Sequence, residues 1–334
     1  MTLCGPALTA AGVERDAPPE LTGAPRRTKR AAVVVNAAKL RTQRSFADFR
    51  RRVDAQFALQ EGWSAPLWLP TTAESRGAAE TRIALETGAD IVLVAGGDGT
   101  IRTVAEQLGG TGVPMGLIPL GTGNLLARNL GTPVGDVVAA VRLACDGADH
   151  RIDLGWLEVD TTGRGDRLRR HAFVVMAGAG IDADIMAGAD PVLKKRFGSI
   201  AYVLSGLRAI RRSRARGEVR VDGSRSALGL SHGLVVGNCG RIQLGVPLLP
   251  DASPSDGILD GFLLTPRTGW EWLGVAWAVL HGRRSHRLIP RYRGRVLEYR
   301  SEEPIRVEVD GDVIGVARRV RAWVHSSGLV VRCA

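Results

Sequence analysis

Short apolar runs alternate with amphipathic segments along the first half of the chain. After the first run, Phe49, Val53 and Phe57 recur four positions apart among charged residues, which is typical of a helix with one buried face. The runs predicted to form strands are residues 31–35, 67–69, 91–95 and 115–118. This alternation predicts a parallel sheet over residues 31–150, with helices on both faces and ligand-binding loops at the carboxyl ends of the strands, as in a nucleotide-binding domain.

The second half has a different pattern. From residue 151, short apolar runs are separated by turns rich in Gly, Pro and Asp, which predicts a mostly β, sandwich-like second domain over residues 151–317. Two helical segments interrupt it, at about 199–212 and 270–280. The last strand, within residues 318–334, is expected to complete the first domain. Residues 1–30 lack periodicity and are predicted to be a mobile tail.

Composition is typical of a globular protein with room for two domains. Of the 334 residues, 45% are hydrophobic and 24% charged, and no apolar run approaches the length of a membrane span. We therefore expect a cytoplasmic location, with peripheral contact at the inner face of the cell membrane as a further possibility. The net charge of +11 favours anionic partners, which include phospholipid, nucleotide and nucleic acid. The sequence leaves the oligomeric state open, including a homodimer.

A glycine-rich turn follows the third predicted strand and precedes a helix. It is formed by Gly96, Gly97, Asp98, Gly99 and Thr100. Glycines leave backbone N–H groups uncovered, and a helix N-terminus carries partial positive charge, so this turn can hold phosphate oxygens. Asp98 does not attract phosphate; it either binds Mg²⁺, fixes the loop or caps the helix, while Thr100 can cap the helix and contact phosphate.

A second turn of this kind follows the fourth predicted strand. It is formed by Gly121, Thr122, Gly123 and Asn124. Two such turns at one sheet edge make an ordinary structural turn a weaker explanation for either. Neither turn matches the lysine-containing P-loop or the GxGxxG dinucleotide motif, so both of those readings are disfavoured.

Together, GGDGT at residues 96–100 and GTxN at residues 121–124 resemble the diacylglycerol kinase catalytic-domain superfamily, particularly its bacterial soluble lipid kinases. The resemblance implies a fold related to NAD kinases and diacylglycerol kinases, with ATP as phosphoryl donor, Mg²⁺ as cofactor and a lipid alcohol as acceptor. It also implies that Asn36 and Thr72 contact the nucleotide. The chain departs from many members in having Leu125 where they have an aspartate.

Carboxylates of the second domain complete the expected site. The resemblance places Asp153 in an active-site network, although a turn aspartate is an alternative, and it implies a structural Mg²⁺ held by Ser253, Asp256 and Ile258. A kinase that acts on an alcohol needs a carboxylate to orient the hydroxyl and accept its proton. Asp310 is the preferred base and Asp312 the alternate. The competing explanation is that the Asp-Gly pair only forms the turn of a β-hairpin.

Two segments bear on how a lipid could reach the site. Basic residues crowd residues 194–216 around an apolar run, and they either hold anionic headgroups or form a solvated face. Trp270, Leu273 and Trp277 share one helical face, and a buried helix is favoured over a membrane wedge.

Two other functions compete with a lipid kinase, and binding to nucleic acid is not expected. One is a soluble kinase like the NAD kinases, which also carry GGDGT but lack the later GTxN motif. The other is a non-catalytic relative that binds anionic membranes.

Overall fold

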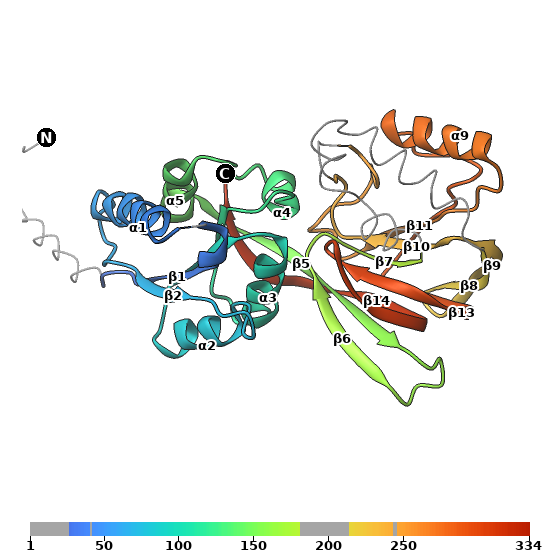
Figure 1. Ribbon diagram of the computed structural model, residues 1–334, viewed down its shortest axis with the longest axis horizontal. Helices are drawn as coiled ribbons and strands as arrows, with labels where there is room; N and C mark the ends of the chain where they lie inside the picture. Colours follow the sequence, from blue (N-terminus) through green and yellow to red (C-terminus); the bar gives the residue numbers. More distant parts are fainter. Residues whose placement is uncertain (1–26, 41, 181–213, 243–245) are drawn as a thin grey trace, which may run out of the picture.

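The computed structural model describes residues 27–40, 42–180, 214–242 and 246–334 (Figure 1). The first domain contains a parallel sheet in the order β2, β1, β3, β4. Its strands are β1 (Ala31–Val35), β2 (Leu67–Pro70), β3 (Ile91–Gly96) and β4 (Met115–Pro119). All residues of β1, β3 and β4 are buried, which explains why they read as continuous apolar runs rather than alternating ones.

Helices cover both faces of this sheet, as Figure 1 shows. On one face, Phe49, Val53 and Val141 pack against Val33 and Leu93. The elements on that face are α1 (Gln43–Ala58) and α5 (Val137–Asp146), and those on the other are α2 (Ala78–Glu86) and α3 (Asp98–Leu108). Two shorter elements, η1 (Ala37–Leu40) and α4 (Leu125–Asn129), follow β1 and β4 at the carboxyl edge of the sheet.

The second domain is mostly antiparallel β-structure with one described helix. Its elements are β5 (Ala148–Asp160), β6 (Leu168–Phe173), β7 (Met176–Gly180), β8 (Ala215–Val221), β9 (Ser224–Ser231), β10 (Gly233–Gly237), β11 (Leu259–Leu263), α9 (Gly269–Leu280), β12 (Arg291–Gly294), β13 (Val296–Val309) and β14 (Asp312–Cys333). A separate hydrophobic core fills this domain, around Phe173, Leu297 and Tyr299. The structure therefore has the α/β domain and the mostly β domain that the sequence predicts.

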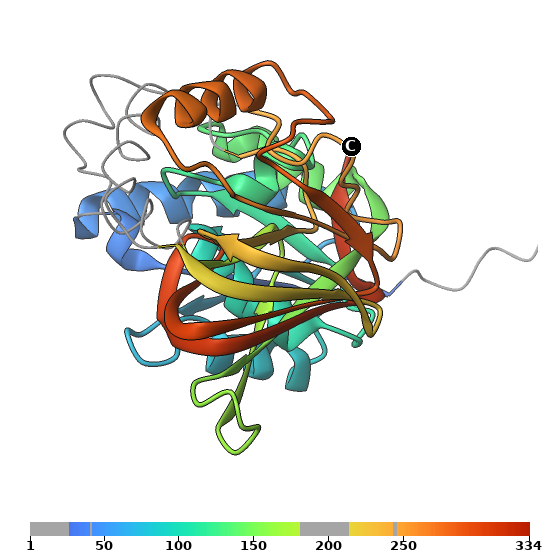
Figure 2. The same cartoon turned by 90° about the vertical axis from the view of Figure 1, so that its right-hand side faces the viewer.

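The last strand, β14, connects the two domains. Its first part pairs with β13, and it pairs with β5 along much of its length. Near its end, Val331 pairs in parallel with Met115 of β4. Figures 1 and 2 show this strand running out of the second domain to the C-terminus in the first. The turn that begins β14 is consequently held between the domains.

Two details of the structure differ from what the sequence pattern suggests, and a third expectation concerns residues that the structure does not describe. The fold begins before Ala31, because the Lys29 N–H donates to the Gly62 carbonyl at 2.7 Å and the Arg30 N–H to Asp90 at 2.7 Å. The apolar run at residues 173–176 contains the break between β6 and β7, which the sequence pattern does not reveal. The predicted helix at 199–212 and the basic residues up to Arg212 lie outside the described residues.

No helix in the described parts of the chain is long and apolar enough to cross a membrane.

Candidate active site

The two glycine-rich loops touch each other at the carboxyl edge of the sheet. The Leu120 N–H donates to the Gly96 carbonyl at 2.8 Å. A Cβ atom on Gly121 would lie 2.8 Å from the Cα atom of Gly97, and one on Gly96 would lie 2.7 Å from the Cβ of Thr100. The first distance requires glycine where the two loops meet, and the second requires it where the first loop turns closely onto Thr100.

Asp98 links the loops. It is the first residue of α3, and its two carboxylate oxygens accept the Asn124 N–H at 2.9 Å and the Leu125 N–H at 2.6 Å. It therefore caps α4 rather than its own helix. Burial raises the pKa of Asp98, the two N–H groups oppose that shift, and the nearby Asp312 carboxylate adds to it. Of the roles considered for Asp98, fixing the loop is directly visible.

Asn124 gives the second loop its shape. It adopts a left-handed backbone conformation with φ of 49°, and its side chain brackets Gly121, accepting the N–H at 2.9 Å and donating to the carbonyl at 2.8 Å. Leu125 is buried in the core of the first domain. A buried aspartate at position 125 would need a polar partner in this core, so the apolar surroundings explain why leucine occupies the position. Thr122 is exposed at the tip of the loop, whereas Gly123 is buried.

Asn36 and Thr72 lie on the loops after β1 and β2, at the same edge of the sheet. The Asn36 amide donates to the Thr100 hydroxyl at 3.2 Å, which ties the first strand to the GGDGT turn. The Thr72 hydroxyl accepts the Ser75 N–H at 3.1 Å and shapes its own loop. Contact of either residue with a nucleotide stays a prediction.

Sequence reasoning missed two basic residues at this edge. Lys39 is exposed, and its Cε lies 3.7 Å from the position that a Cβ on Gly97 would occupy. Arg102 donates to Asp312 at 2.7 Å and also to the Val309 carbonyl. Arg102 could have been found from the sequence, because it follows Asp98 by four residues and so lies on the same face of α3. For Lys39 the sequence gives only its position three residues after Asn36.

Asp310 and Asp312 occupy different environments although only Gly311 separates them. Asp310 is buried, and its carboxylate accepts the N–H groups of Val174, Val175 and Met176 at 2.9–3.0 Å. Burial raises the pKa of Asp310 to about 6, against the opposing effects of Arg102 and the three N–H groups. These contacts explain the break between β6 and β7, and they leave Asp310 facing the protein interior.

Asp312 faces the first loop. Its side chain is half exposed, and its Oδ2 lies 3.0 Å from the position that a Cβ on Gly99 would take. Asp310 and Gly311 both have positive φ, 47° and 89°, and form the two-residue turn of the β13–β14 hairpin. Of the two candidate bases, Asp310 faces the protein interior and Asp312 faces the first loop; a catalytic role for either stays a prediction.

Asp153 is also fully engaged. It is buried, and its carboxylate accepts the Gly257 N–H at 2.6 Å and the Ser327 N–H at 2.8 Å. It therefore links the segment around Gly257 to β14, at the point between His325 and Leu329 where the pairing of β14 with β5 shifts register. This is a structural connection, and the contacts do not bring Asp153 to the glycine-rich loops.

The segment expected to bind a structural metal ion contains an ion pair instead. Arg293 donates to Asp256 at 2.8 Å and lies 3.0 Å from Asp260, while the second oxygen of Asp256 accepts the Ile258 N–H at 3.1 Å. The Ser253 hydroxyl lies 3.5 Å from that of Ser255. Because a guanidinium already neutralises Asp256, this arrangement does not fit a metal ion at Ser253, Asp256 and Ile258.

The carboxylates at the glycine-rich loops are Asp98 and Asp312. Mg²⁺ prefers oxygen ligands and is commonly held by one or two carboxylates together with substrate phosphates and water. Asp98 already accepts the Asn124 and Leu125 N–H groups, and Asp312 is paired with Arg102. With nucleotide phosphates and water supplying most of the ligands, Asp98 is the residue that would hold the ion, directly or through water.

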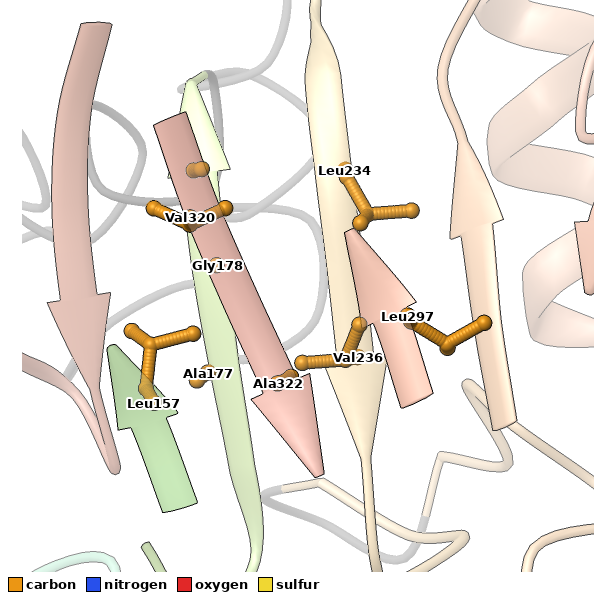
Figure 3. Close-up of a pocket in the computed structure, with 9 residues that line it drawn as sticks. Leu157, Ala177, Gly178, Leu234, Val236, Leu297, Val320 and Ala322 are labelled. Carbon is orange, nitrogen blue, oxygen red and sulfur yellow. The ribbon is translucent and has the colours of Figure 1, made fainter. Parts of the chain in front are cut away.

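A narrow apolar pocket lies inside the second domain (Figure 3). It is too narrow to admit water, and the residues around it belong to the hydrophobic core of the second domain. The small residues Ala177 and Gly178 of β7 line it, together with larger side chains such as Leu157, Leu234 and Val320. Because β7 begins at Met176, the strand that lines the pocket is also the strand held by Asp310.

The comparisons with known proteins agree with this architecture. Residues 30–157 match the model of the diacylglycerol kinase catalytic domain, and residues 175–325 match that of the YegS C-terminal NAD kinase beta sandwich-like domain. A probable lipid kinase YegS-like of Pseudomonas aeruginosa is 32% identical over 257 residues, covering 74% of this chain and 78% of the relative. The corresponding protein of Stenotrophomonas maltophilia is 30% identical over 245 residues, covering 69% and 75%.

Two further comparisons concern proteins named diacylglycerol kinase. The one from Mycobacterium tuberculosis is 31% identical over 178 residues, which are 53% of this chain and 55% of that protein. The crystal structure of a diacylglycerol kinase from Bacillus anthracis superposes with a TM-score of 0.68 at 16% identity, covering 93% of this chain and 99% of the other. That likeness shows a shared fold.

The two-domain fold with its paired glycine-rich loops is that of a kinase. The chain belongs to the diacylglycerol kinase catalytic-domain family, in the branch whose second domain is of the YegS type.

The ion pair of Arg293 generates a prediction about metal dependence. We expect the melting temperature of the protein to be the same in Mg²⁺ and in EDTA, because Arg293 already neutralises Asp256. Arg293→Met should lower the melting temperature, and Mg²⁺ should partly restore it; at ten times its Kd an ion stabilises by roughly 1.4 kcal/mol. Arg295→Met, at an exposed position nearby, is the control. A clear loss of wild-type stability in EDTA would contradict this role of Arg293.

Proposed function

We propose that this protein is an ATP-dependent lipid kinase, which transfers the γ-phosphate of ATP to a hydroxyl group of a lipid such as diacylglycerol or a sphingoid base. The observation that carries the proposal is the position of Asp312. A carboxylate from the second domain lies against Gly99, in the loop best suited to hold phosphate. A phosphate-binding turn and an acceptor-activating group from different domains are thereby brought together.

The phosphate side of the reaction is assigned to the loops. The turn at Gly96 and Gly97 precedes α3, so its N–H groups and the helix N-terminus favour polyphosphate oxygens. Lys39 adds a positive charge over Gly97. Mg²⁺, when bound at Asp98, would offset the charge on the transferred phosphoryl group. The chain's own contribution is to hold the donor in a fixed orientation.

The acceptor side is assigned to Asp312. Its carboxylate would accept a hydrogen bond from the attacking hydroxyl and take the proton as the oxygen bonds to phosphorus. Arg102 holds one of its oxygens at 2.7 Å and so orients the group. Arg102 acts through Asp312 and is a positioning residue.

The lipid acceptor is proposed from the family relationship, because relatives of this chain are named probable lipid kinase YegS-like. The apolar pocket does not add to this support, since its lining residues form the packed core of the second domain and leave no room for water. Strand β7 in that core is anchored by Asp310 next to the hairpin that carries Asp312.

Incubation with γ-labelled ATP, Mg²⁺ and an extract of cellular lipids tests the proposal. We expect the label in the organic phase, in a product that runs as a phosphorylated lipid. Omission of Mg²⁺ should abolish it. Label recovered only in NADP after addition of NAD would instead identify a kinase of the NAD kinase type. Absence of label in any acceptor would favour a non-catalytic membrane-binding relative.

A pair of variants separates the two hairpin carboxylates. Asp312→Asn should lower kcat by roughly 10²–10⁴-fold, because general base catalysis is lost. Its melting temperature should change little, since Asp312 is half exposed. Asp310→Asn places an amide N–H against one of three backbone donors and should cost about 1–3 kcal/mol of stability. Because Asp310 anchors the turn that carries Asp312, the kcat of this variant below its melting temperature should fall, but much less than that of Asp312→Asn.

The same pair can refute the assignment. A folded Asp310→Asn protein without activity, beside an Asp312→Asn protein with normal kcat, would return the base to Asp310.

A further inference from the structure

Helix α9 begins with a well-formed cap. The Thr268 hydroxyl accepts the Glu271 N–H at 3.3 Å, and the Glu271 carboxylate accepts the Thr268 N–H at 3.1 Å. This capping box fixes the start of the helix and occupies the acidic residue of its first turn. The remaining helix residues are apolar or glycine.

One side of α9 is packed against the second domain. Trp272, Val275 and Ala278 are buried and contact a cluster that includes Val235 of β10 and Phe262 of β11. Their spacing of three residues places them on one face. Figures 1 and 2 show the helix lying at the outside of the domain, away from the β5–β6 hairpin.

The opposite side of α9 is apolar and is not covered by the residues that the structure describes. Trp270 is 83% exposed, Trp277 49% and Leu273 44%, and their spacing places them on a second face. The sequence favoured a buried helix; among residues 27–40, 42–180, 214–242 and 246–334, only one of its two apolar faces is covered. A helix that is apolar on all sides ordinarily has an apolar environment on all sides.

Basic residues flank the helix in the sequence, and one of them contacts this face. Arg267 precedes the helix, and Arg283, Arg284 and Arg287 follow it. Arg283 lies over the ring of Trp277, 4.8 Å from its centre. The acids in contact are Asp251, 2.9 Å from Arg284, and Glu271, 3.9 Å from Arg287. Four arginines against two carboxylates leave the surroundings positive.

We propose that the outer face of α9 is a docking surface for an anionic membrane, with Trp270, Leu273 and Trp277 inserted at headgroup depth and the arginines on lipid phosphates. Tryptophan favours this interface because its ring is apolar and its N–H can reach water. A helix with an exposed apolar face and adjacent arginines lies in the plane of such a surface. In a two-fold dimer through this face, the arginines of the two copies would meet, which disfavours a second copy as the occupant.

The biological reason for this docking rests on the proposed function, since a lipid kinase must reach substrates that reside in a bilayer. Membrane binding itself can be measured without any measurement of catalysis. Vesicles of phosphatidylcholine alone, and of phosphatidylcholine and phosphatidylglycerol in equal parts, are the probes. The full-length protein should sediment with the anionic vesicles and much less with the neutral ones, and high salt should weaken the binding.

The variant Trp270→Ala/Trp277→Ala tests the face directly. We expect its affinity for anionic vesicles to fall by about tenfold or more, because apolar area that would enter the membrane is lost. Leu168→Ala, an exposed apolar residue on the β5–β6 hairpin, is the matched control and should bind as the wild type. Unchanged melting temperatures would show that both variants are folded.

Three outcomes would overturn the proposal: equal binding of wild type and double variant, equal binding to both kinds of vesicle, or a wild-type dimer that the double variant dissociates. Phosphorylation of a short-chain, water-soluble diacylglycerol separates this inference from the proposed function. Activity on that substrate should be unchanged in the double variant, while activity on vesicle-bound lipid should fall. If vesicles bind as expected but no lipid is phosphorylated, the proposed function fails and the docking surface stands.

Discussion

The buried carboxylate of Asp310 is the contact on which the position of Asp312 at the first domain depends. It binds three consecutive backbone N–H groups at the break between β6 and β7 and thereby anchors the β13–β14 hairpin. Burying a charged carboxylate is costly, and the raised pKa of Asp310 reflects that cost. The hydrogen bonds offset it. The result is a rigid turn that projects Asp312 from the second domain toward Gly99 in the first.

Asp98 performs the corresponding task within the first domain. By accepting the N–H groups of Asn124 and Leu125, it fixes the second glycine-rich loop against the first. Two carboxylates that could be taken for catalytic groups are thus committed to backbone hydrogen bonds. Asp312 has a half-exposed side chain at the same place. The geometry of the proposed site rests on carboxylates that organise the backbone as much as on the one proposed to face a substrate.

Much of this could be predicted from the sequence because local rules apply to it. Runs such as 91–95 must be strands buried on both faces, and glycines at positions 96 and 121 mark close approach. The roles of Asp310 and Asp312 could not be predicted. Residues two apart in a strand share a face, but the left-handed turn at Asp310 and Gly311 breaks that rule. The pairing of Arg293 with Asp256 and the one-sided burial of α9 depend on contacts distant in sequence.

The central claim is that Asp312, positioned by Asp310, faces a nucleotide phosphate held by the glycine-rich loops. A crystal structure with Mg²⁺ and a non-hydrolysable ATP analogue measures this directly. We predict the γ-phosphate beside the N–H groups of Gly97 and Gly99, with room for an acceptor oxygen at about 3 Å from both the phosphorus and the Asp312 carboxylate. Phosphates bound elsewhere, or an Asp310 carboxylate released from its three N–H groups and turned to the nucleotide in place of Asp312, would contradict the account.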